Sequence, residues 1–428
     1  MKLAVIGGGS SYTPELLDGL FERLDVVPLS EVWLMDLDAA RLAVNGGLAE
    51  RMAAAHGHPF TVHLTHDLTE AVRGAKYVIT QIRVGQMAAR IADEKLGQRW
   101  GIVGQETTGV GGFACALRTI PRILEVAHLM EAHAPDGYLL NFTNPAGINT
   151  EAVIRHSRVK TVGLCNVPIG MIMDVQKHVG GSWSDIELDY VGLNHLSWVR
   201  RVARGGEDIT QAVFERFFDE VAEEEWPDEA VRADMLAAMR SLGMFCNYYL
   251  QYFYATAPVL KNLLAKEKTR GEEVVEIEQR LFEKYQDPNR HEKPEELSQR
   301  GGAHYSTAAF HLIEAIEQDR RSRQVVVCRN QGAVPTFDDD AAVEVSAWVG
   351  AGGAEPLPQH APEPGIRGLM QLVKAYETLT VEAAVTGNRE AAFQALLEHP
   401  LTPDADGCRR LLDEVLEVNR PHLHGTFF

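Results

Sequence analysis

Short apolar runs alternate with amphipathic stretches along the first third of the chain. Residues 3–6 form an apolar run that leads into three glycines, residues 7–9, and from Thr13 onward apolar residues recur at the spacing of one helical face. This pattern predicts a β-strand, a glycine turn and a helix. We expect Thr13 to be the N-cap of that helix, with Pro14 at its first helical position.

Later apolar runs of the same kind predict four more parallel strands. Each run ends in polar or turn-forming residues, and an open parallel sheet binds its ligands beyond the carboxyl ends of its strands. We therefore expect one site to gather the polar side chains at these ends, which are Asp36, Arg83, Asn141, Asn144, Cys165 and Asn166.

The pattern changes after residue 168. The second part is predicted to hold a hairpin, a helical stretch, more strands and a helical tail, over residues 186–204, 241–285, 323–350 and 366–373 respectively. The fold class is therefore α/β. We predict a Rossmann-like dinucleotide-binding domain in residues 1–168 and an α+β domain, which carries substrate and metal residues, in residues 169–428.

Composition argues against a nucleic-acid-binding protein and against a membrane protein. The 428 residues carry a formal net charge of −19, which argues against a nucleic-acid partner, because such binding needs basic surfaces. No apolar run approaches the roughly 18 residues of a membrane span. The five cysteines are scattered without a CxxC pair, which suits a reducing compartment. We expect a cytoplasmic protein that is not attached to a membrane.

The glycine turn predicts a nicotinamide cofactor. Gly7, Gly9 and Ser10 would let the chain approach a pyrophosphate, and Asp36 ends the second strand, where its carboxylate can accept hydrogen bonds from a ribose. That carboxylate would repel a 2′-phosphate, so NAD is favoured over NADP. The usual third glycine is replaced by Tyr12, and a glycine turn without a nucleotide is the alternative interpretation.

Cys165 and His195 are candidate ligands of a metal ion. Each alone is more often a buried core residue, and two ligands thirty positions apart are not a zinc signature. An incomplete protein shell does suit a catalytic ion whose remaining positions go to substrate oxygens and water. A set of sulfur, nitrogen and substrate oxygen fits Mn²⁺ or another divalent metal.

Eight ordered motifs give the chain a family resemblance that covers nearly its whole length. They are VIGGGSSYTPEL, IRVGQMAARIADE, GIVGQETTGVGGF, NFTNPAG, GLCNVPIG, YVGLNHLSW, YYLQYFY and RGGAHYSTAA. Together they resemble glycoside hydrolase family 4, and within it the bacterial 6-phospho-β-glucosidases. That family is an NAD-dependent exception to two-carboxylate glycoside hydrolysis.

The resemblance implies a reaction without net oxidation. C3 of the sugar is oxidised by tightly bound NAD⁺, a base removes the C2 proton, the glycosidic oxygen is eliminated, water adds, and the hydride returns. The implied roles are Tyr249 as base, Glu106 as the group that raises its basicity, Cys165 and His195 as metal ligands, and substrate contacts from Arg90, Asn144, Asn166 and Arg270.

The resemblance also indicates the substrate and the assembly. Two arginines in one pocket suit a sugar 6-phosphate, and Asn166 stands where the family's α-glycosidases tend to carry an aspartate as general acid. The expected substrate is a phosphorylated disaccharide or β-glucoside, such as cellobiose 6′-phosphate, and the expected assembly is a homodimer or homotetramer.

Other functions stay open at this stage. Within the family, a 6-phospho-β-galactosidase or an enzyme for unphosphorylated sugars is possible. Outside it, NFTNPAG resembles the strand-end asparagine–proline of malate-type and lactate-type dehydrogenases, whose fold the chain is expected to share. A non-catalytic NAD-binding sensor is the third alternative, although it would not need Tyr249 or a metal pair.

Overall fold

The computed structural model describes residues 1–428 except 181, 183–184, 224–227, 302–303 and 424, so part of the RGGAHYSTAA motif lies outside the described residues. Its main element is a nine-stranded sheet in the order β13-β12-β11-β6-β5-β4-β1-β2-β3. The six N-terminal strands are parallel, at β1 (Lys2–Ile6), β2 (Glu31–Met35), β3 (Thr61–Thr65), β4 (Tyr77–Thr80), β5 (Tyr138–Asn141) and β6 (Lys160–Gly163).

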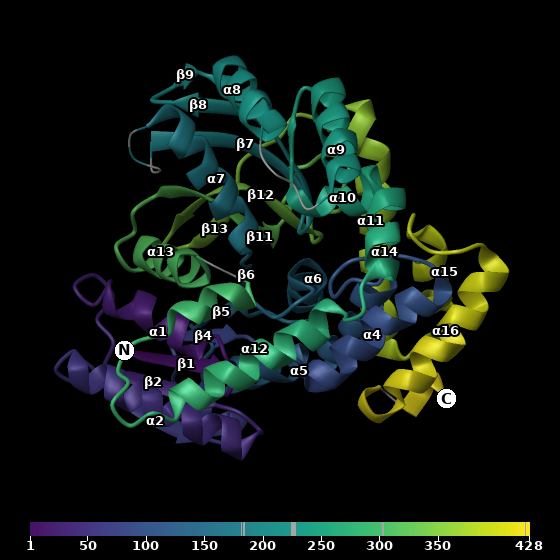
Figure 1. Cartoon of the computed structure of the whole chain (residues 1–428). Helices are drawn as coiled ribbons and strands as arrows, with labels where there is room; N and C mark the ends of the chain where they lie inside the picture. The colour runs from purple at the N-terminus through teal and green to yellow at the C-terminus, as the bar shows by residue number, and fades with distance from the viewer. Residues whose placement is uncertain (181, 183–184, 224–227, 302–303, 424) are drawn as a thin grey trace.

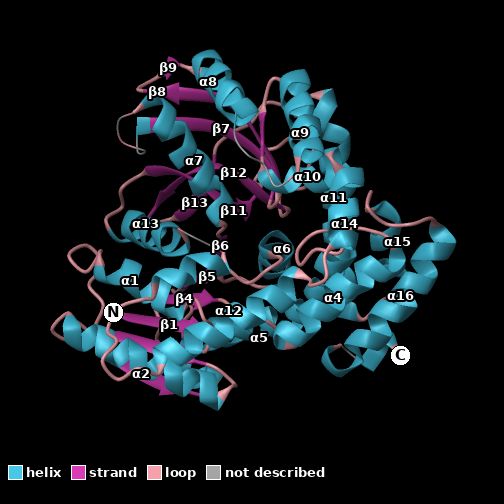
Figure 2. Ribbon diagram, in the orientation of Figure 1, coloured by secondary structure: helices cyan, strands magenta, loops and turns pink. Residues whose placement is uncertain are grey.

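The parallel part follows the doubly wound order 3-2-1-4-5-6. Its central strands are apolar on both faces, because helices cover both sides of the sheet. The connecting helices are α1 (Thr13–Phe21), α2 (Ala39–Ala55), α3 (Leu68–Val72), α4 (Gln86–Trp100), α5 (Gly109–His133) and α6 (Ala146–His156). Figure 2 shows these helices around the strands. The order reverses between β1 and β4, which is where such sheets bind ligands.

A smaller sheet lies beyond α7 (Asn166–Val179). In it β7 (Ile186–Leu193) and β8 (Leu196–Arg204) form the predicted antiparallel hairpin, with Leu193 paired to Leu196 across the turn. The short strands β9 (Glu207–Asp208) and β10 (Phe245–Cys246) pair with β8. Figure 1 shows this sheet, with α8 (Thr210–Glu223), at the end of the molecule opposite the N-terminus.

Helices supply most of the remaining chain. They are α9 (Glu229–Leu242), η2 (Tyr248–Leu250), α10 (Gln251–Tyr254), α11 (Thr256–Ala265), α12 (Arg270–Tyr285), η3 (Glu295–Arg300), α13 (Tyr305–Glu317), α14 (Pro364–Thr386), α15 (Arg389–Glu398), α16 (Ala405–Asn419), η4 (Arg420–His422) and η5 (Gly425–Phe427). Figure 1 shows α12 running close to the N-terminal sheet. Among the described residues, no helix is both long enough and apolar enough to cross a membrane.

The strands predicted near the C-terminus extend the N-terminal sheet. β11 (Ser322–Arg329) pairs antiparallel with β6, and β12 (Ala342–Gly350) and β13 (Gly353–Pro356) follow at the edge. One sheet therefore runs across the predicted boundary at residue 168. The division into 1–168 and 169–428 stays a prediction.

The start of α1 differs from the expectation. Thr13 is the first helical residue rather than the N-cap, and Tyr12 holds the N-cap position. The reason is that the Thr13 hydroxyl donates a hydrogen bond of 2.9 Å back to the carbonyl of Gly8, inside the glycine turn. The Thr13 side chain thus stabilises the turn instead of the helix N–H groups.

Candidate active site

A cavity of about 2340 Å³ opens beyond the carboxyl ends of β1, β2 and β4. Most of the residues predicted from the sequence line it, from the N-terminal sheet on one side and from η2 and α12 on the other. They are Gly7, Gly9, Ser10, Asp36, Arg90, Glu106, Asn144, Asn166, Tyr249 and Arg270. Cys165 and His195 are buried and are not part of this lining.

The glycine turn is tight and closes against the second strand. Gly7 has a φ of +94°, and a Cβ there would lie 2.7 Å from the carbonyl oxygen of Gln81. The Gly9 N–H donates to Asp36 Oδ2 at 2.8 Å, and a Cβ on Gly9 would meet that same oxygen at 2.7 Å. Asp36 keeps further lone pairs for ribose hydroxyls, so the turn and this carboxylate fit an NAD nucleotide.

Glu106 lies among arginines in the wall of the cavity. Its Oε2 accepts an ion pair of 2.9 Å from Arg90, and its Oε1 is paired with Arg83. Burial by itself would raise the pKa of Glu106, but Arg83, Arg90 and Arg300 together hold that pKa at about 2. Arg90 also pairs with Glu94 at 2.8 Å. Glu106 is therefore ionised at neutral pH and fixes the two guanidinium groups that flank it.

Cys165 and His195 lie next to each other, in contact with the cavity-lining residues Asn166 and Tyr249 respectively. The Cys165 Sγ and His195 Nε2 atoms lie 3.6 Å apart, and the Thr107 hydroxyl contacts His195 Nδ1 at 2.9 Å. Cys165 is the N-cap of α7 after β6, and His195 stands in the turn between β7 and β8 with a φ of +66°. Burial lowers the pKa of His195 to about 4, so the ring is neutral, which is the form that binds metals.

The pair fits a divalent ion. A separation of 3.6 Å suits two ligands that lie roughly 2.0–2.3 Å from one tetrahedral ion. Burial raises the pKa of the Cys165 thiol to about 12, and a bound cation would favour the thiolate instead. Among the described residues no cluster of three or more His, Cys, Asp or Glu side chains could hold a metal. The ion would therefore need substrate or water for its other positions.

Tyr249 covers the imidazole of His195. The two rings are stacked, with centroids 3.8 Å apart and planes 3° from parallel. Tyr249 belongs to the short helix η2, and its N–H donates to the side chain of Asn247, the N-cap. Burial raises the pKa of Tyr249 well above its ordinary value, with Tyr252 adding to the effect. In the free protein the phenol is therefore protonated.

The other residues predicted to bind the substrate, Asn144, Asn166 and Arg270, come from three different segments. Asn166 is the first residue of α7 and directly follows Cys165, and Asn144 lines the cavity near α6. Arg270 begins α12, is exposed, and pairs with Glu273 at 3.1 Å while donating to the Gln299 carbonyl at 2.9 Å. The structure thus brings all three to the same cavity.

One residue predicted for the site serves the fold instead. Asn141 is fully buried, and its amide donates to the Ala146 carbonyl and to Thr150, while its oxygen accepts from Thr80. It holds the loop that carries Asn144 and does not line the cavity. The prediction that Asn141 ends β5 is confirmed. Its side-chain oxygen and amide are, however, all engaged in hydrogen bonds with the strand and the turn that follows it.

Arg300, the last residue of η3, has no predicted role but belongs to the site. Its side chain is largely buried, lines the cavity, and pairs with Glu278 at 3.1 Å. Glu278 also accepts from Ser11 at 2.7 Å and pairs with Arg41 at 3.3 Å, which ties α12 to the nucleotide turn. The available signal was the arginine that opens the RGGAHYSTAA motif.

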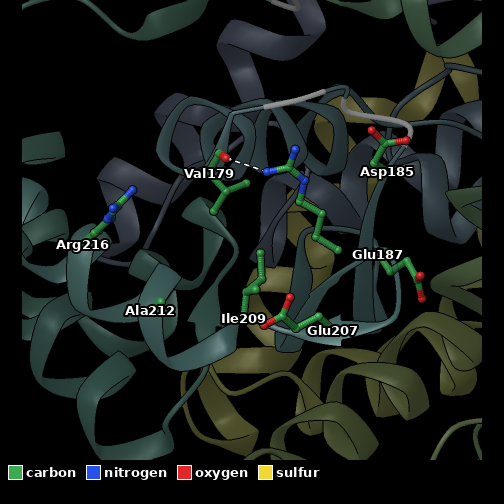
Figure 3. A pocket seen from close by; sticks show the side chains of 9 residues that line it. Val179, Asp185, Glu187, Glu207, Ile209, Ala212 and Arg216 are labelled. Atoms are coloured by element: carbon green, nitrogen blue, oxygen red, sulfur yellow. Dashed lines mark hydrogen bonds between the residues drawn. The ribbon is translucent and has the colours of Figure 1, made fainter.

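A second cavity, of about 670 Å³, lies at the end of the hairpin β7–β8 where Ile186 pairs with Arg204, opposite the His195 turn. Figure 3 shows the residues that line it. Its walls carry Asp185, Glu187 and Glu207, and the guanidinium of Arg204 donates to the Val179 carbonyl at 2.8 Å. None of the residues predicted for catalysis or for cofactor binding lines it. The candidate active site is therefore the larger cavity.

Comparison with known proteins decides the family. The model described as Family 4 glycosyl hydrolase matches residues 2–180, and that of the Family 4 glycosyl hydrolase C-terminal domain matches residues 190–402. The chain belongs to glycosyl hydrolase family 4. It is 40% identical to a probable 6-phospho-beta-glucosidase of Bacillus subtilis, over 100% of this chain and 98% of the relative. The resemblance inferred from the eight motifs is thereby confirmed.

Solved structures agree with this assignment to family 4. A 6-phospho-beta glucosidase from Thermotoga maritima, solved with manganese, NAD⁺ and glucose-6-phosphate, superposes with a TM-score of 0.91 at 38% identity, covering 99% of each chain. A lactate dehydrogenase from Cryptosporidium parvum superposes with a TM-score of 0.53 at 14% identity, over 90% of this chain and 98% of that one. The second likeness shows the fold alone, and it confirms the predicted dehydrogenase-like α/β architecture of this family 4 chain.

Proposed function

We propose that this chain is a 6-phospho-β-glucosidase that hydrolyses 6-phosphorylated β-glucosides with NAD⁺ and a divalent metal, foremost Mn²⁺. The observation that carries the proposal is the cluster around Tyr249, which lines the same cavity as the nucleotide turn. There Cys165 Sγ lies 3.6 Å from His195 Nε2, and Tyr249 is stacked on that histidine. A malate-type or lactate-type dehydrogenase needs no such ligand pair, and a sensor needs no buried tyrosine there.

The reaction needs the metal and the nucleotide as well as side chains of the protein. When bound, NAD⁺ takes a hydride from C3 of the sugar and returns it, and the metal held by Cys165 and His195 polarises the neighbouring sugar oxygens. Tyr249 removes the proton at C2, and the resulting electron pair expels the glycosidic oxygen from C1. After water has added at C1, Tyr249 gives a proton back to C2.

Arginines make the cavity suitable for an anionic substrate. The chain has a net charge of −19, so a sugar phosphate needs local positive charge to bind. Arg90 is held in place by Glu94 and Glu106, and Arg270 stands at the start of α12. We assign Arg90, Asn144, Asn166 and Arg270 to the substrate, with Arg270 near its 6-phosphate.

Asn166 supports β-linked substrates. An amide cannot donate a proton as a general acid does, so departure of the aglycone depends on the elimination itself or on a water molecule. Glucosides are favoured over galactosides by the names of the relatives. A 6-phospho-β-galactosidase, or an enzyme for unphosphorylated sugars, is the alternative within the same family.

Three further features belong to the proposal. The enzyme acts in the cytoplasm without a nucleic-acid partner, as a homodimer or homotetramer. Residues 1–168 bind the nucleotide, and residues 169–428 complete the substrate and metal site. Sedimentation of the purified protein measures the assembly, and a monomer at working concentration would contradict it.

A release assay tests the proposed function. The purified protein is given α-linked and β-linked nitrophenyl glucosides, each with and without a 6-phosphate, in the presence of NAD⁺, Mn²⁺ and a reductant. We expect release from the β-linked 6-phosphate alone, without accumulation of NADH. Stoichiometric NADH would indicate a dehydrogenase, and tight NAD⁺ binding without any release would indicate a sensor.

A further inference from the structure

Glu344 is a buried carboxylate without a cationic partner. It lies on β12 with 1% of its surface exposed, and no ion pair within the described part of the chain includes it. Burial raises the pKa of Glu344 to about 7, although hydrogen bonds from neighbouring side chains oppose the shift. Burial of a carboxylate without a cationic partner lowers the stability of the fold, which indicates a function that its hydrogen bonds serve.

The hydrogen bonds of Glu344 lead to the His195 turn. Its Oε1 accepts a hydrogen bond of 2.9 Å from the side-chain amide of Asn194, the residue directly before His195. β12 packs against β7, and Glu344 does not line the cavity. His195 has a φ of +66°, a conformation that L residues seldom adopt, so the turn needs support from outside.

The other carboxylate oxygen of Glu344 is connected to Tyr249 through a series of hydrogen bonds. Glu344 Oε2 accepts from the Tyr190 hydroxyl at 2.9 Å and from the Ser197 hydroxyl at 3.2 Å. Ser197 Oγ in turn accepts from the amide of Asn247 at 2.9 Å.

The path ends at the backbone of the proposed base. The side-chain oxygen of Asn247 accepts the Tyr249 N–H at 3.0 Å, and Ser197 and Asn247 are also joined by a backbone hydrogen bond of 2.9 Å. Ser197 and Asn247 are fully buried, so no water competes for these bonds.

We propose that Glu344 is a positioning residue that fixes the His195 turn and the Tyr249 helix relative to each other. This inference rests on the proposed function of Tyr249 and His195. The two rings stack face to face with centroids 3.8 Å apart, but they come from separate elements. Hydrogen bonds connect Glu344 to Asn194, which precedes His195, and through Ser197 and Asn247 to the backbone of Tyr249. The carboxylate acts through its two acceptor oxygens, and it does not touch the substrate.

The variants separate hydrogen bonding from charge. In Glu344→Gln the amide still offers an oxygen to Asn194 and an N–H to the two hydroxyls, which can rotate to accept it. In Glu344→Leu the volume is kept, but Asn194, Tyr190 and Ser197 lose their acceptor. Each variant is made alone and together with Tyr249→Phe, and kcat, KM and Mn²⁺ affinity by calorimetry are measured.

We expect Glu344→Leu to lower kcat by roughly 30-fold to 100-fold with KM nearly unchanged, because small misplacements of reacting groups have effects of this size. Glu344→Gln should restore most of the rate. In the Tyr249→Phe background, Glu344→Leu should lower kcat little further, because the two changes affect one unit. Mn²⁺ affinity should fall about tenfold in the Leu variant, since the partners that orient a ligand affect binding.

Glu151→Gln is the matched control. Glu151 is equally buried and near the same strand, where it pairs with Lys374 and accepts from the Ala342 N–H, and it takes no part in the hydrogen bonds described above. It should lose stability without loss of kcat. If Glu344→Leu does not fold, Ser197→Ala interrupts the same path and should lower kcat, though less.

Two results from Glu344→Leu would overturn the inference, and a third from Glu344→Gln would do the same, all while leaving the proposed function intact. One is a normal kcat in a folded Glu344→Leu protein, and the other is a full additional loss in the Tyr249→Phe background. A Gln variant as impaired as the Leu variant would also refute positioning through hydrogen bonds. Absence of 6-phospho-β-glucosidase activity in the unaltered protein would instead refute the proposed function.

Discussion

Glu106 and Arg90 form a buried ion pair of 2.9 Å in the wall of the cavity, and the second oxygen of Glu106 is paired with Arg83. The carboxylate is therefore committed to two guanidinium groups and stays ionised, with a pKa of about 2. Burial above all raises the pKa of Tyr249, and the negative charge of Glu106 adds to that increase. The predicted role of Glu106, to raise the basicity of the tyrosine, requires an influence of this sign, and that role stays a prediction.

Glu106→Gln should change how stability depends on pH. The folded pKa of Glu106, about 2, is below its ordinary value of 4.5, so its contribution is complete above 4.5 and is lost as the pH falls toward 2. The free energy of unfolding of the wild type should exceed that of the variant at pH 6. The difference should shrink by about 1–1.5 kcal/mol at pH 3.5, as measured by urea unfolding.

The variant Glu125→Gln is the control for that experiment, because Glu125 lies in an exposed pair with Arg122. Its effect on the free energy of unfolding should be small, because exposed ion pairs contribute little to stability. A difference for Glu106→Gln that is independent of pH would mean that the carboxyl is not held ionised by its arginines.

Removal of the metal should abolish activity. Chelation should stop turnover, and Mn²⁺ together with NAD⁺ should restore it, because Cys165 and His195 are the only side chains assigned to the ion. Cys165→Ser should weaken Mn²⁺ binding, measured by calorimetry, by about tenfold or more, since the thiolate is the stronger ligand. Full activity of a metal-free protein, verified by elemental analysis, would contradict the assignment.

Arg270→Ala should affect the phosphorylated substrate selectively. Arg270 is exposed and already paired with Glu273, so we expect KM for a 6-phosphorylated β-glucoside to rise by about tenfold, with kcat nearly unchanged. Arg280, exposed on the same helix and outside the cavity, provides the control through Arg280→Ala. Equal effects of the two substitutions would remove Arg270 from the phosphate site.

Local patterns predicted the elements that carry the site. The apolar runs predicted five of the six parallel strands but not the edge strand β3, and the residues that follow them, such as Asp36 and Asn144, do line the cavity. The hairpin at residues 186–204 was also predicted, and it places His195 at its turn. These features could be predicted because strand periodicity and strand order together determine which ends face the ligand.

Contacts between distant segments could not be predicted in the same way. Arg300 and Glu278 meet Ser11 only when η3 and α12 fold over the nucleotide turn, so the motif that begins at Arg300 could not reveal this contact. Likewise the stretch that holds β11 and β12 was predicted to form strands, but the pairing of β11 with β6, which adds both strands to the N-terminal sheet, depends on tertiary packing. Glu344 shares this limitation, since a single acidic residue in an apolar strand shows its role only through Asn194 and Ser197.

Tyr249→Phe isolates the base. The variant keeps the ring that stacks on His195 but lacks the hydroxyl, so NAD⁺ and Mn²⁺ binding should change little. Turnover should fall by roughly 10²-fold to 10⁴-fold, the usual effect of losing a general base. Tyr248→Phe is the matched control, because Tyr248 is the neighbouring, exposed ring. A wild-type rate for Tyr249→Phe would mean that another group takes the proton.

The central claim is that hydrolysis proceeds through loss of the C2 proton. Running the reaction of a 6-phosphorylated β-glucoside in D₂O and analysing the released sugar phosphate by NMR tests it most directly. The account predicts deuterium at C2 of the product from the wild-type enzyme, because Tyr249 exchanges the proton that it removes with solvent. A product formed at the full rate without deuterium at C2 would contradict elimination and would indicate direct displacement at C1.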